Sequence, residues 1–366
     1  MTGTAGRVPK QEQEPAHEAI TEVAPGVLRA QLPIDFTGLG HVNCYLLEDR
    51  DGVAIVDPGL PGPSSYRALR ARLADAGFPI ERVHTVIVTH SHPDHFGGAG
   101  RVRHESGARI VTHRRFRLMW DPTEPPDVDV EDLPAVTDVL ERRFPWDPVP
   151  WDGQQMEFSR RRKLAYQVSR RFPRLMRTPT PTDRLDEADT ISLGRRDWVA
   201  IHTPGHTDDH LCLFDPTHGV MLSGDHVLPT ITPHVGGLSP IADPLAAFMG
   251  SLDKVGAYRG DVSVVLPAHG HPFADLGGRV DAIKQHHDRR LEQVRDVAAR
   301  FDRPATVAEF STHLFSARVQ GTMADSETYA HLEHLRRAGE MIRATAPMPY
   351  RYALSDQPVP PGAKPA

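Results

Sequence analysis

The sequence predicts an α/β protein, because strand patterns and helix patterns occupy different parts of its 366 residues. Short apolar runs bounded by Gly, Pro and Asp, which are typical of strands, recur in two stretches. Between these stretches the pattern is lost over residues 114–183, which are rich in Pro, Trp and Arg. Near the C-terminus, apolar residues recur at steps of three and four, which indicates helices. We therefore predict one domain over residues 20–275, with a helical insertion over 114–183, and a small helical domain over 276–366.

The strand-like runs are short and are separated by turn residues. In the first half they cover residues 26–32, 42–47, 53–56, 83–88 and 108–111, and in the second half residues 198–202, 211–214, 219–222 and 262–266. Asp57-Pro58-Gly59 ends the third run, and the helix that follows carries Leu69 and Leu73 and ends at Gly77. Several loops after these strands carry His or Asp, so polar side chains are expected at strand ends.

The two ends of the chain have patterns of their own. Residues 1–19 are polar, with little to bury, so we predict a disordered tail. In the C-terminal region, Thr306-Val307-Ala308-Glu309 is a capping box that predicts the start of a helix. A later helix is predicted from Ser326 to Ala338, where Gly339 ends it.

The composition argues against several classes of function. A net charge of -6 gives no overall attraction to nucleic acid, so we expect no DNA partner. The two cysteines, Cys44 and Cys212, are too few for a disulfide framework. The N-terminus lacks the apolar segment of a secretion signal, and no later stretch is apolar enough to cross a membrane. We therefore expect a cytoplasmic protein without a membrane span, and the sequence leaves a homodimer open.

The residues that can carry chemistry follow the strand-like runs. His90-Ser91-His92-Pro93-Asp94-His95 comes directly after the strand over 83–88, and three later loops add further His and Asp. The seven candidate ligands are His90, His92, Asp94, His95, His206, Asp225 and His269. Imidazole and carboxylate groups without thiolates suit zinc, iron or manganese and leave positions open for water, as in catalytic sites. Alternate loop residues can point the same way, so the run offers one pair of ligands to each of two ions.

This ligand pattern resembles that of the metallo-β-lactamase superfamily, whose hydrolases use an H-x-H-x-D-H run, a distal His, a bridging Asp and a final His. The resemblance implies an αβ/βα sandwich of two mixed sheets with outer helices. It also implies two divalent metal ions, with zinc as the first choice and iron or manganese as alternatives. One site would take His90, His92 and His206, the other would take Asp94, His95 and His269, and Asp225 would bridge both.

Details of the resemblance narrow the reaction. Asp225 is similar to the bridging Asp of the glyoxalase II-like and lactonase-like branches, which true β-lactamases of the superfamily usually lack. The resemblance thus implies that a water shared by two cations becomes a hydroxide, which attacks the carbonyl of a small-molecule acyl thioester or ester. Asp94 would orient this hydroxide and accept its proton. Persulfide dioxygenases share several ligands but bind one iron, so single-metal chemistry stays an alternative.

The C-terminal region leaves other activities open. Residues 306–341 resemble the winged-helix-type tail of a subgroup of these hydrolases, which includes single-strand RNA endonucleases. A metal-dependent endoribonuclease, a lactonase and a metal-binding sensor without activity are therefore alternatives to a thioesterase. The acidic net charge weighs against an RNA substrate.

Four residues are candidates for contact with the substrate. His226 and His234 lie in the loop after the last candidate Asp ligand, where either side chain can border a substrate. The stretch 160–177 is strongly basic and has apolar residues at four-residue steps, so we predict an amphipathic helix there. Its Arg161 and Arg170 can bind an anionic substrate as part of a lid, and a solvated positive face is the alternative.

Overall fold

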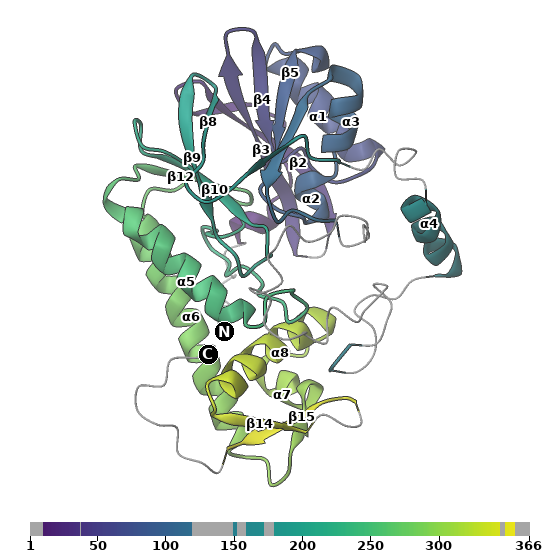
Figure 1. The fold of residues 1–366 in the computed structure, drawn as a ribbon, viewed down its shortest axis with the longest axis vertical. Coiled ribbons are helices and arrows are strands. Elements are labelled where there is room, and N and C mark those ends of the chain that lie inside the picture. Colours follow the sequence, from purple (N-terminus) through teal and green to yellow (C-terminus); the bar gives the residue numbers. More distant parts are fainter. Residues whose placement is uncertain are drawn as a thin grey trace, which may run out of the picture.

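The structure is a computed structural model that describes residues 10–36, 38–118, 149–151, 159–171, 179–344 and 348–355. Its largest part is a sandwich of two β-sheets with helices on the outer faces (Figure 1). Both sheets contain parallel and antiparallel pairs of strands. The predicted α/β class and αβ/βα sandwich are therefore confirmed.

The first sheet has seven strands in the order β1 to β7. They are β1 (Thr21–Ala24), β2 (Val27–Phe36), β3 (Leu39–Asp49), β4 (Gly52–Val56), β5 (Val83–Ile87), β6 (Arg109–His113) and β7 (Asp183–Leu185). The first four strands pair antiparallel and the last four pair parallel. Helices α1 (Pro63–Asp75) and α3 (Ala99–Ser106) cover the outer face, where Leu69 and Val102 belong to the same apolar cluster as Val86 of β5.

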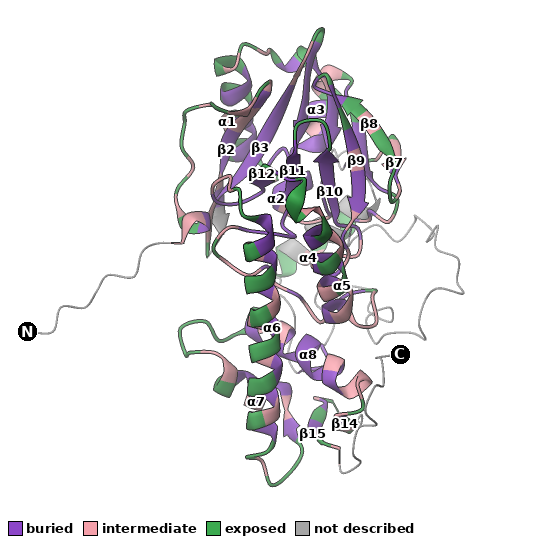
Figure 2. Cartoon of the chain, turned by 90° about the vertical axis from the view of Figure 1, so that its left-hand side faces the viewer, coloured by how far each residue is buried: buried purple, intermediate pink, exposed green. Residues whose placement is uncertain are grey.

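The second sheet has five strands in the order β12, β11, β10, β9 and β8. They are β8 (Thr190–Leu193), β9 (Arg196–His202), β10 (Leu211–Asp215), β11 (Val220–Gly224) and β12 (Val264–Pro267). Helices α5 (Pro244–Gly256) and α6 (Leu276–Ala298) pack against this sheet, and in Figure 2 they run from its lower edge toward the C-terminal region. Leu252 of α5, Ile283 of α6 and Cys212 of β10 share one buried apolar cluster.

Large apolar side chains fill the space between the two sheets. Tyr45 and Leu47 of the first sheet pack in one cluster with Trp198 and Leu213 of the second. Each buried side chain of this size contributes roughly 1.5–3 kcal/mol by leaving water. This layer therefore fixes the two sheets against each other, and with them the loops at their edge.

The C-terminal region combines helices with a small sheet. After α6 come α7 (Val307–Leu314), α8 (Thr322–Arg337) and a three-stranded sheet formed by β13 (Ala305–Thr306), β15 (Arg351–Leu354) and β14 (Met341–Ala344). The predicted capping box is confirmed, since Glu309 N donates to Thr306 Oγ1 at 3.3 Å and Thr306 N donates to the Glu309 carboxylate at 2.7 Å. The domain boundaries and the winged-helix resemblance stay predictions.

Part of the predicted insertion lies within the described residues. Helix α4 (Arg160–Arg171) occupies the predicted basic amphipathic stretch, and Leu164 and Val168 on it are 62% and 43% exposed. Trp151 is buried, and its ring centroid lies 5.2 Å from that of Tyr329 on α8. Residues 119–148, 152–158 and 172–178 of the insertion lie outside the described residues.

The N-terminal segment differs from the predicted disordered tail. Residues Gln11–Gln13 form a short 3-10 helix, η1, and the Glu12 side chain is completely buried. Its carboxylate accepts hydrogen bonds from Thr230 and Ile231 in a distant loop. Composition could not reveal this order, because hydrogen bonds to a distant loop hold the segment rather than apolar burial. Residues 1–9 lie outside the described residues.

The lengths and compositions of the helices bear on the expectation that the chain has no membrane span. In the described part of the chain, no helix combines the length and the apolar character that a membrane crossing needs.

Candidate metal centre

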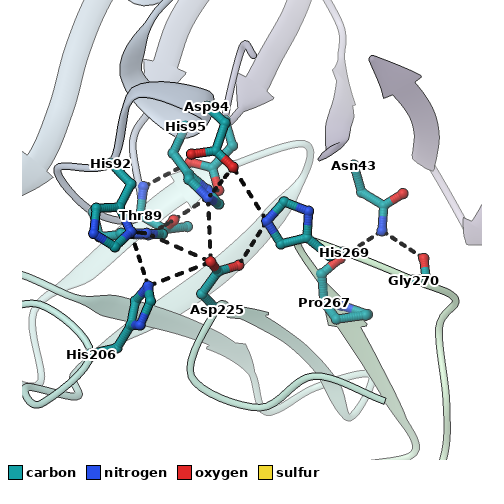
Figure 3. A network of polar contacts seen from close by, with 12 residues as sticks. Asn43, Thr89, His92, Asp94, His95, His206, Asp225, Pro267, His269 and Gly270 are labelled. Atoms are coloured by element: carbon teal, nitrogen blue, oxygen red, sulfur yellow. Dashed lines mark hydrogen bonds and ion pairs between the residues drawn. The ribbon is translucent and has the colours of Figure 1, made fainter. Parts of the chain in front are cut away.

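Four loops meet at one edge of the sandwich, and each follows the carboxyl end of a strand. The loop after β5 carries the run from His90 to His95, and the loop after β9 carries His206. Asp225 directly follows β11, and His269 follows β12. Strands from both sheets therefore deliver side chains to one point, where Figure 3 shows them facing one another.

The backbone around the first run separates its ligands into two pairs. His92 is still extended, and Pro93 then begins the short helix α2 (Pro93–Phe96). Because the chain turns from extended to helical here, His90 and His92 fall into one group of metal-ligating atoms, and Asp94 and His95 fall into another. The structure thus shows the division into two pairs that the spacing predicted.

A glycine allows the strand before Asp225 to approach the centre closely. Gly224 has a φ of +50°, and a Cβ atom there would lie 2.6 Å from Nε2 of His210. The same His210 nitrogen accepts a hydrogen bond from the backbone N–H of Asp225 at 3.0 Å. A side chain at residue 224 would therefore displace the ring that fixes Asp225.

The first group consists of three imidazoles and one carboxylate. His92 Nδ1 lies 3.0 Å from His90 Nε2 and 3.0 Å from His206 Nε2. Oδ2 of Asp225 lies 3.8 Å from His90 Nε2 and 3.5 Å from His206 Nε2. These four atoms face one small volume, as ligands of one ion do.

The second group lies on the other side of Asp225. Oδ2 of Asp94 lies 3.5 Å from Nε2 of His95 and 3.5 Å from Nε2 of His269. Oδ1 of Asp225 lies 3.3 Å from His269 Nε2, and its Oδ2 lies 3.6 Å from His95 Nε2. The Asp225 carboxylate therefore stands between the two groups and faces both (Figure 3).

Several buried atoms of this centre have no hydrogen-bond partner. They are Nε2 of His95, Nε2 of His269 and Oδ1 of Asp225. Buried polar atoms are rarely left unpaired, and each of these atoms has a lone pair that a cation can accept. The nitrogen and oxygen donors present thus fit divalent metal ions such as zinc, iron or manganese.

Asp57 orients two of the ligands from behind. Its carboxylate accepts hydrogen bonds from Thr89 N at 2.8 Å, from Thr89 Oγ1 at 2.8 Å and from Nδ1 of His95 at 2.9 Å. Thr89 Oγ1 also lies 3.1 Å from Nδ1 of His90. Asp57 adopts a φ of +56°, a strained conformation that persists where surrounding contacts enforce it. We predicted that Asp57 ends a strand and missed its role as an outer partner of the ligands.

Backbone carbonyls orient two further ligands. Nδ1 of His206 donates to the carbonyl oxygen of His234 at 2.6 Å. Nδ1 of His269 donates to the carbonyl oxygen of His41, also at 2.6 Å. A protonated Nδ1 leaves Nε2 as the lone-pair nitrogen, so both rings present the metal-binding tautomer toward Asp225.

The charge state of the first group suits metal binding. Burial, followed by the proximity of His95 and His92, lowers the pKa of His90 well below its ordinary value. Burial and the nearby His206 lower the pKa of His92 to about 3. Both rings are therefore neutral near pH 7, which is the form that binds metal ions.

The second group holds charges of both signs. Burial alone would lower the pKa of His95, but the carboxylates of Asp94, Asp225 and Asp57 raise it well above its ordinary value. Burial alone would raise the pKa of Asp225, but His269 and His95 hold it well below its usual range. The carboxylates thus attract positive charge into this group, and a divalent cation would satisfy that demand in place of protons.

The predicted substrate residues occupy different environments. His226 is completely buried, with its ring centroid 5.0 Å from that of Phe248, and burial lowers its pKa to about 3. This position favours a structural role for His226 over the predicted contact with substrate. His234 keeps 24% of its side chain exposed, and Nδ1 lies 3.6 Å from the Glu327 carboxylate of α8. Its backbone carbonyl holds His206, whereas the predicted contact of His234 with substrate stays a prediction.

The two arginines of α4 are not joined to the centre by any contact of the described residues. The Arg161 side chain is exposed, and the Arg170 side chain lies outside the described residues. Their predicted contact with substrate therefore stays a prediction.

The sequence of the sandwich matches a known family model. Residues 37–269 match the model of the metallo-beta-lactamase superfamily, a range that includes all seven candidate ligands. The chain belongs to the metallo-β-lactamase superfamily. Its membership supports a hydrolase with a metal-binding site, whereas the glyoxalase II-like branch stays a prediction.

Relatives with solved structures or curated sequences cover most of the chain. A metallo-beta-lactamase family protein from Thermus thermophilus, TTHA1429, is 28% identical with a TM-score of 0.68, over 91% of this chain and 100% of that one. The probable metallo-hydrolase YqjP of Bacillus subtilis (strain 168) is 25% identical over 326 residues, which are 84% of this chain and 92% of that protein. The acyl-coenzyme A thioesterase MBLAC2 of Gallus gallus is 27% identical over 236 residues, 64% of this chain and 74% of that protein.

Proposed function

We propose that this protein is a binuclear metallo-hydrolase that cleaves acyl thioesters of a large anionic carrier such as coenzyme A. The observation that carries the proposal is the position of Asp225, whose carboxylate faces two separate groups of ligands. The thioester is supported by the similarity to the acyl-coenzyme A thioesterase MBLAC2.

The ligand residues would have different roles in the proposed reaction. His90, His92 and His206 would hold one ion, Asp94, His95 and His269 would hold the other, and Asp225 would join them. Divalent ions supply, when bound, a Lewis acid for the carbonyl oxygen and an acidified water as the nucleophile. Zinc is our first choice of metal, and iron or manganese fit the same donors.

Asp94 is the residue that we propose as proton acceptor. Its side chain is 11% exposed, whereas the side chains of His90, His95 and His269 are fully buried. The Asp94 carboxylate therefore keeps a small solvent-exposed surface, as the Asp225 carboxylate does at 9%. A carboxylate at this place can orient the attacking water and take its proton, before passing the proton to the departing thiolate.

The test compares substrates and one variant. The metal-loaded protein would be assayed with an acyl-coenzyme A, a simple ester, a lactone and single-stranded RNA, with free thiol measured by a colorimetric reagent. We expect thiol release that Asp94→Ala abolishes and that Asp75→Ala, at an exposed position at the end of α1, leaves unchanged. Cleavage of RNA or lactone without thiol release would contradict the thioester, and full activity of Asp94→Ala would contradict the mechanism.

A further inference from the structure

A segment from the start of the chain lies across two of the loops that carry the candidate ligands. We call residues 10–14, which include η1, the N-terminal strap. Its Glu12 side chain is completely buried although it is a carboxylate. Burying a carboxylate costs free energy unless donors surround it, so its partners indicate what the strap is built to hold.

Glu12 binds the loop that follows Asp225. Its carboxylate accepts hydrogen bonds from Thr230 N at 2.8 Å and from Ile231 N at 3.0 Å, and a further bond from the Thr230 hydroxyl. On α6, the Arg279 guanidinium donates to the carbonyl oxygens of Leu228 and Ile231. The peptide groups of residues 228–231 are thus held by an anion through their N–H groups and by a cation through their carbonyls.

This loop continues to a partner of a ligand in the first group. Three residues after Ile231 comes His234, whose carbonyl oxygen accepts the Nδ1–H of His206 at 2.6 Å. The position of that carbonyl sets the direction in which His206 Nε2 points. Glu12 therefore acts on His206 through the backbone of residues 230–234.

The strap also reaches the second group. The carbonyl oxygen of Glu14 accepts the Nδ1–H of His41 at 2.7 Å, and Nε2 of His41 accepts the N–H of Gly270 at 3.1 Å. The carbonyl oxygen of His41 in turn accepts the Nδ1–H of His269 at 2.6 Å. Glu14 of the strap thus fixes the ring of His41, and the backbone carbonyl of His41 orients His269.

Close approaches hold the strap against β3 and against the loop after β12. A Cβ atom on Gly40 of β3 would lie 2.1 Å from the carbonyl oxygen of Glu14. A Cβ atom on Gly270 would lie 2.6 Å from Cγ of Pro229 in the other loop and 3.4 Å from Cβ of Gln11 in the strap. The strap therefore contacts β3 and the loop of Gly270 directly, and the two loops contact each other.

We propose that the N-terminal strap is a positioning element that sets both groups of metal ligands at once, with Glu12 as its main positioning residue. It acts on His206 through the loop at residues 228–234 and on His269 through His41, and these two ligands lie on opposite sides of Asp225 in Figure 3. This inference rests on the proposed metal centre.

The test measures metal binding rather than turnover. Zinc affinity would be determined by competition with a chelator for the full chain, and the cobalt(II) form would report ligand geometry through its visible absorption. We expect Glu12→Ala to weaken zinc binding by about tenfold, as loss of outer partners of metal ligands does, and to change the cobalt spectrum. Glu12→Gln should restore most of the affinity, because its amide oxygen can still accept both N–H groups.

Matched variants separate positioning from general stability. Glu18→Ala removes an exposed carboxylate four residues after the strap and should leave zinc affinity and the cobalt spectrum unchanged. Urea unfolding of the metal-free variants gives their stability separately. If Glu12→Ala lowers stability but binds zinc with wild-type affinity and spectrum, the strap is only structural and the inference is wrong.

Two further results would separate the role of the strap from the existence of the metal centre. If Glu12→Ala does not fold, Thr230→Val removes one donor to Glu12 and should still weaken zinc binding several-fold, and wild-type affinity would overturn the inference. A wild-type protein that binds no metal would refute the proposed function itself, whereas metal binding that is equal in wild type and Glu12→Ala would refute only the role of the strap.

Discussion

Asp225 is the residue on which the two ligand groups depend. Its Oδ1 lies 3.3 Å from His269 Nε2, and its Oδ2 lies 3.5 Å from His206 Nε2, so one carboxylate serves both. Nε2 of His210 fixes its backbone by accepting the N–H of Asp225 at 3.0 Å. No other contact in the described centre joins the groups through two oxygens of one side chain.

Replacing Asp225 by Asn tests this joint role. The amide keeps the shape of the side chain but offers one oxygen, and its NH₂ group cannot bind a cation. We expect Asp225→Asn to lose about half of the bound metal and at least about 100-fold in kcat. Metal analysis and thioester kinetics would check this, with Asp75→Asn as control. Full metal content with normal kcat would contradict the joint role.

Substitutions of Asp57 test whether its carboxylate orients the metal ligands. Asp57→Ala leaves Thr89 N–H and the Nδ1–H of His95 without an acceptor, which costs about 1–3 kcal/mol of unfolding free energy, whereas Asp57→Asn keeps one oxygen that can accept from one of them. We expect Asp57→Asn to lower metal affinity by roughly 10–100-fold. Asn tolerates the positive φ at this position, so the comparison with Asp57→Ala separates the lost carboxylate from backbone strain. Metal affinity that is unchanged in Asp57→Asn would refute the orienting role.

The ligands and their partners differ in how far sequence could predict them. His90 to His95 were readable because a dense run of ligand types follows a strand, and the structure brings them together with His206, Asp225 and His269. The roles of Asp57 and Glu12 could not be predicted, since each acts through a contact with a residue far away in the chain. Such partners carry no local pattern.

At the level of elements, helix α7 begins where its sequence predicts. The hydrogen bonds from Arg303 and from the backbone of Thr306 lower the pKa of Glu309 to about 2 from an ordinary value of 4.5. A carboxyl group with a lowered pKa stabilises the fold above about pH 4.5, and this stability is lost as the pH falls toward 2.

The capping box therefore predicts a pH-dependent effect of Glu309→Gln. We expect a loss of about 1 kcal/mol of unfolding free energy at pH 7, which shrinks as the pH falls below 4.5. Urea unfolding between pH 7 and pH 3 would measure it, with Glu292→Gln at an exposed position of α6 as control. A difference that is independent of pH would contradict the charge of Glu309 as its cause.

Helix α4 gives a prediction about substrate. If its basic face binds an anionic carrier, Arg161→Glu together with Arg170→Glu should raise KM for an acyl-coenzyme A by about tenfold, the effect of one lost charge-assisted contact. The kcat value, and the KM for an uncharged acyl thioester, should change little. Arg67→Glu on α1 is a control that reverses charge at another exposed arginine. Equal KM values for wild type and the double variant would contradict the prediction that α4 is a substrate-binding lid.

The elements of the sandwich were more predictable than the ends of the chain. Runs such as β4 are apolar on both faces and buried in the structure, so a continuous run of apolar residues identified them. The β13–β15–β14 sheet consists of strands of two and four residues, which are too short to leave a clear pattern. The N-terminal strap is polar, so its composition indicated disorder.

In the whole molecule, the candidate metal centre takes its ligands from both sheets and so connects them. The first sheet supplies His90, Asp94 and their neighbours, and the second supplies His206, Asp225 and His269. Any ion bound there contacts both layers of the sandwich. Metal binding should therefore stabilise the packing of the two sheets in addition to supporting catalysis.

Metal removal should thus lower the thermal stability of the whole protein. A ligand that binds only the folded state at a thousand times its Kd adds about 4 kcal/mol of unfolding free energy. We expect chelation to lower Tm by several degrees and re-addition of zinc to restore it. The same treatment should have a smaller effect on Asp225→Asn. A Tm that does not respond to chelation in a protein shown to lose its metal would contradict this coupling.

We propose above all that Asp225 joins two metal ions held by separate groups of ligands. Anomalous X-ray diffraction from crystals of the zinc-loaded protein, measured at the zinc edge, tests it most directly. We expect two anomalous peaks, one among His90, His92 and His206 and one among Asp94, His95 and His269, with Asp225 between them. One peak at full zinc loading, or two ions that do not share Asp225, would contradict it.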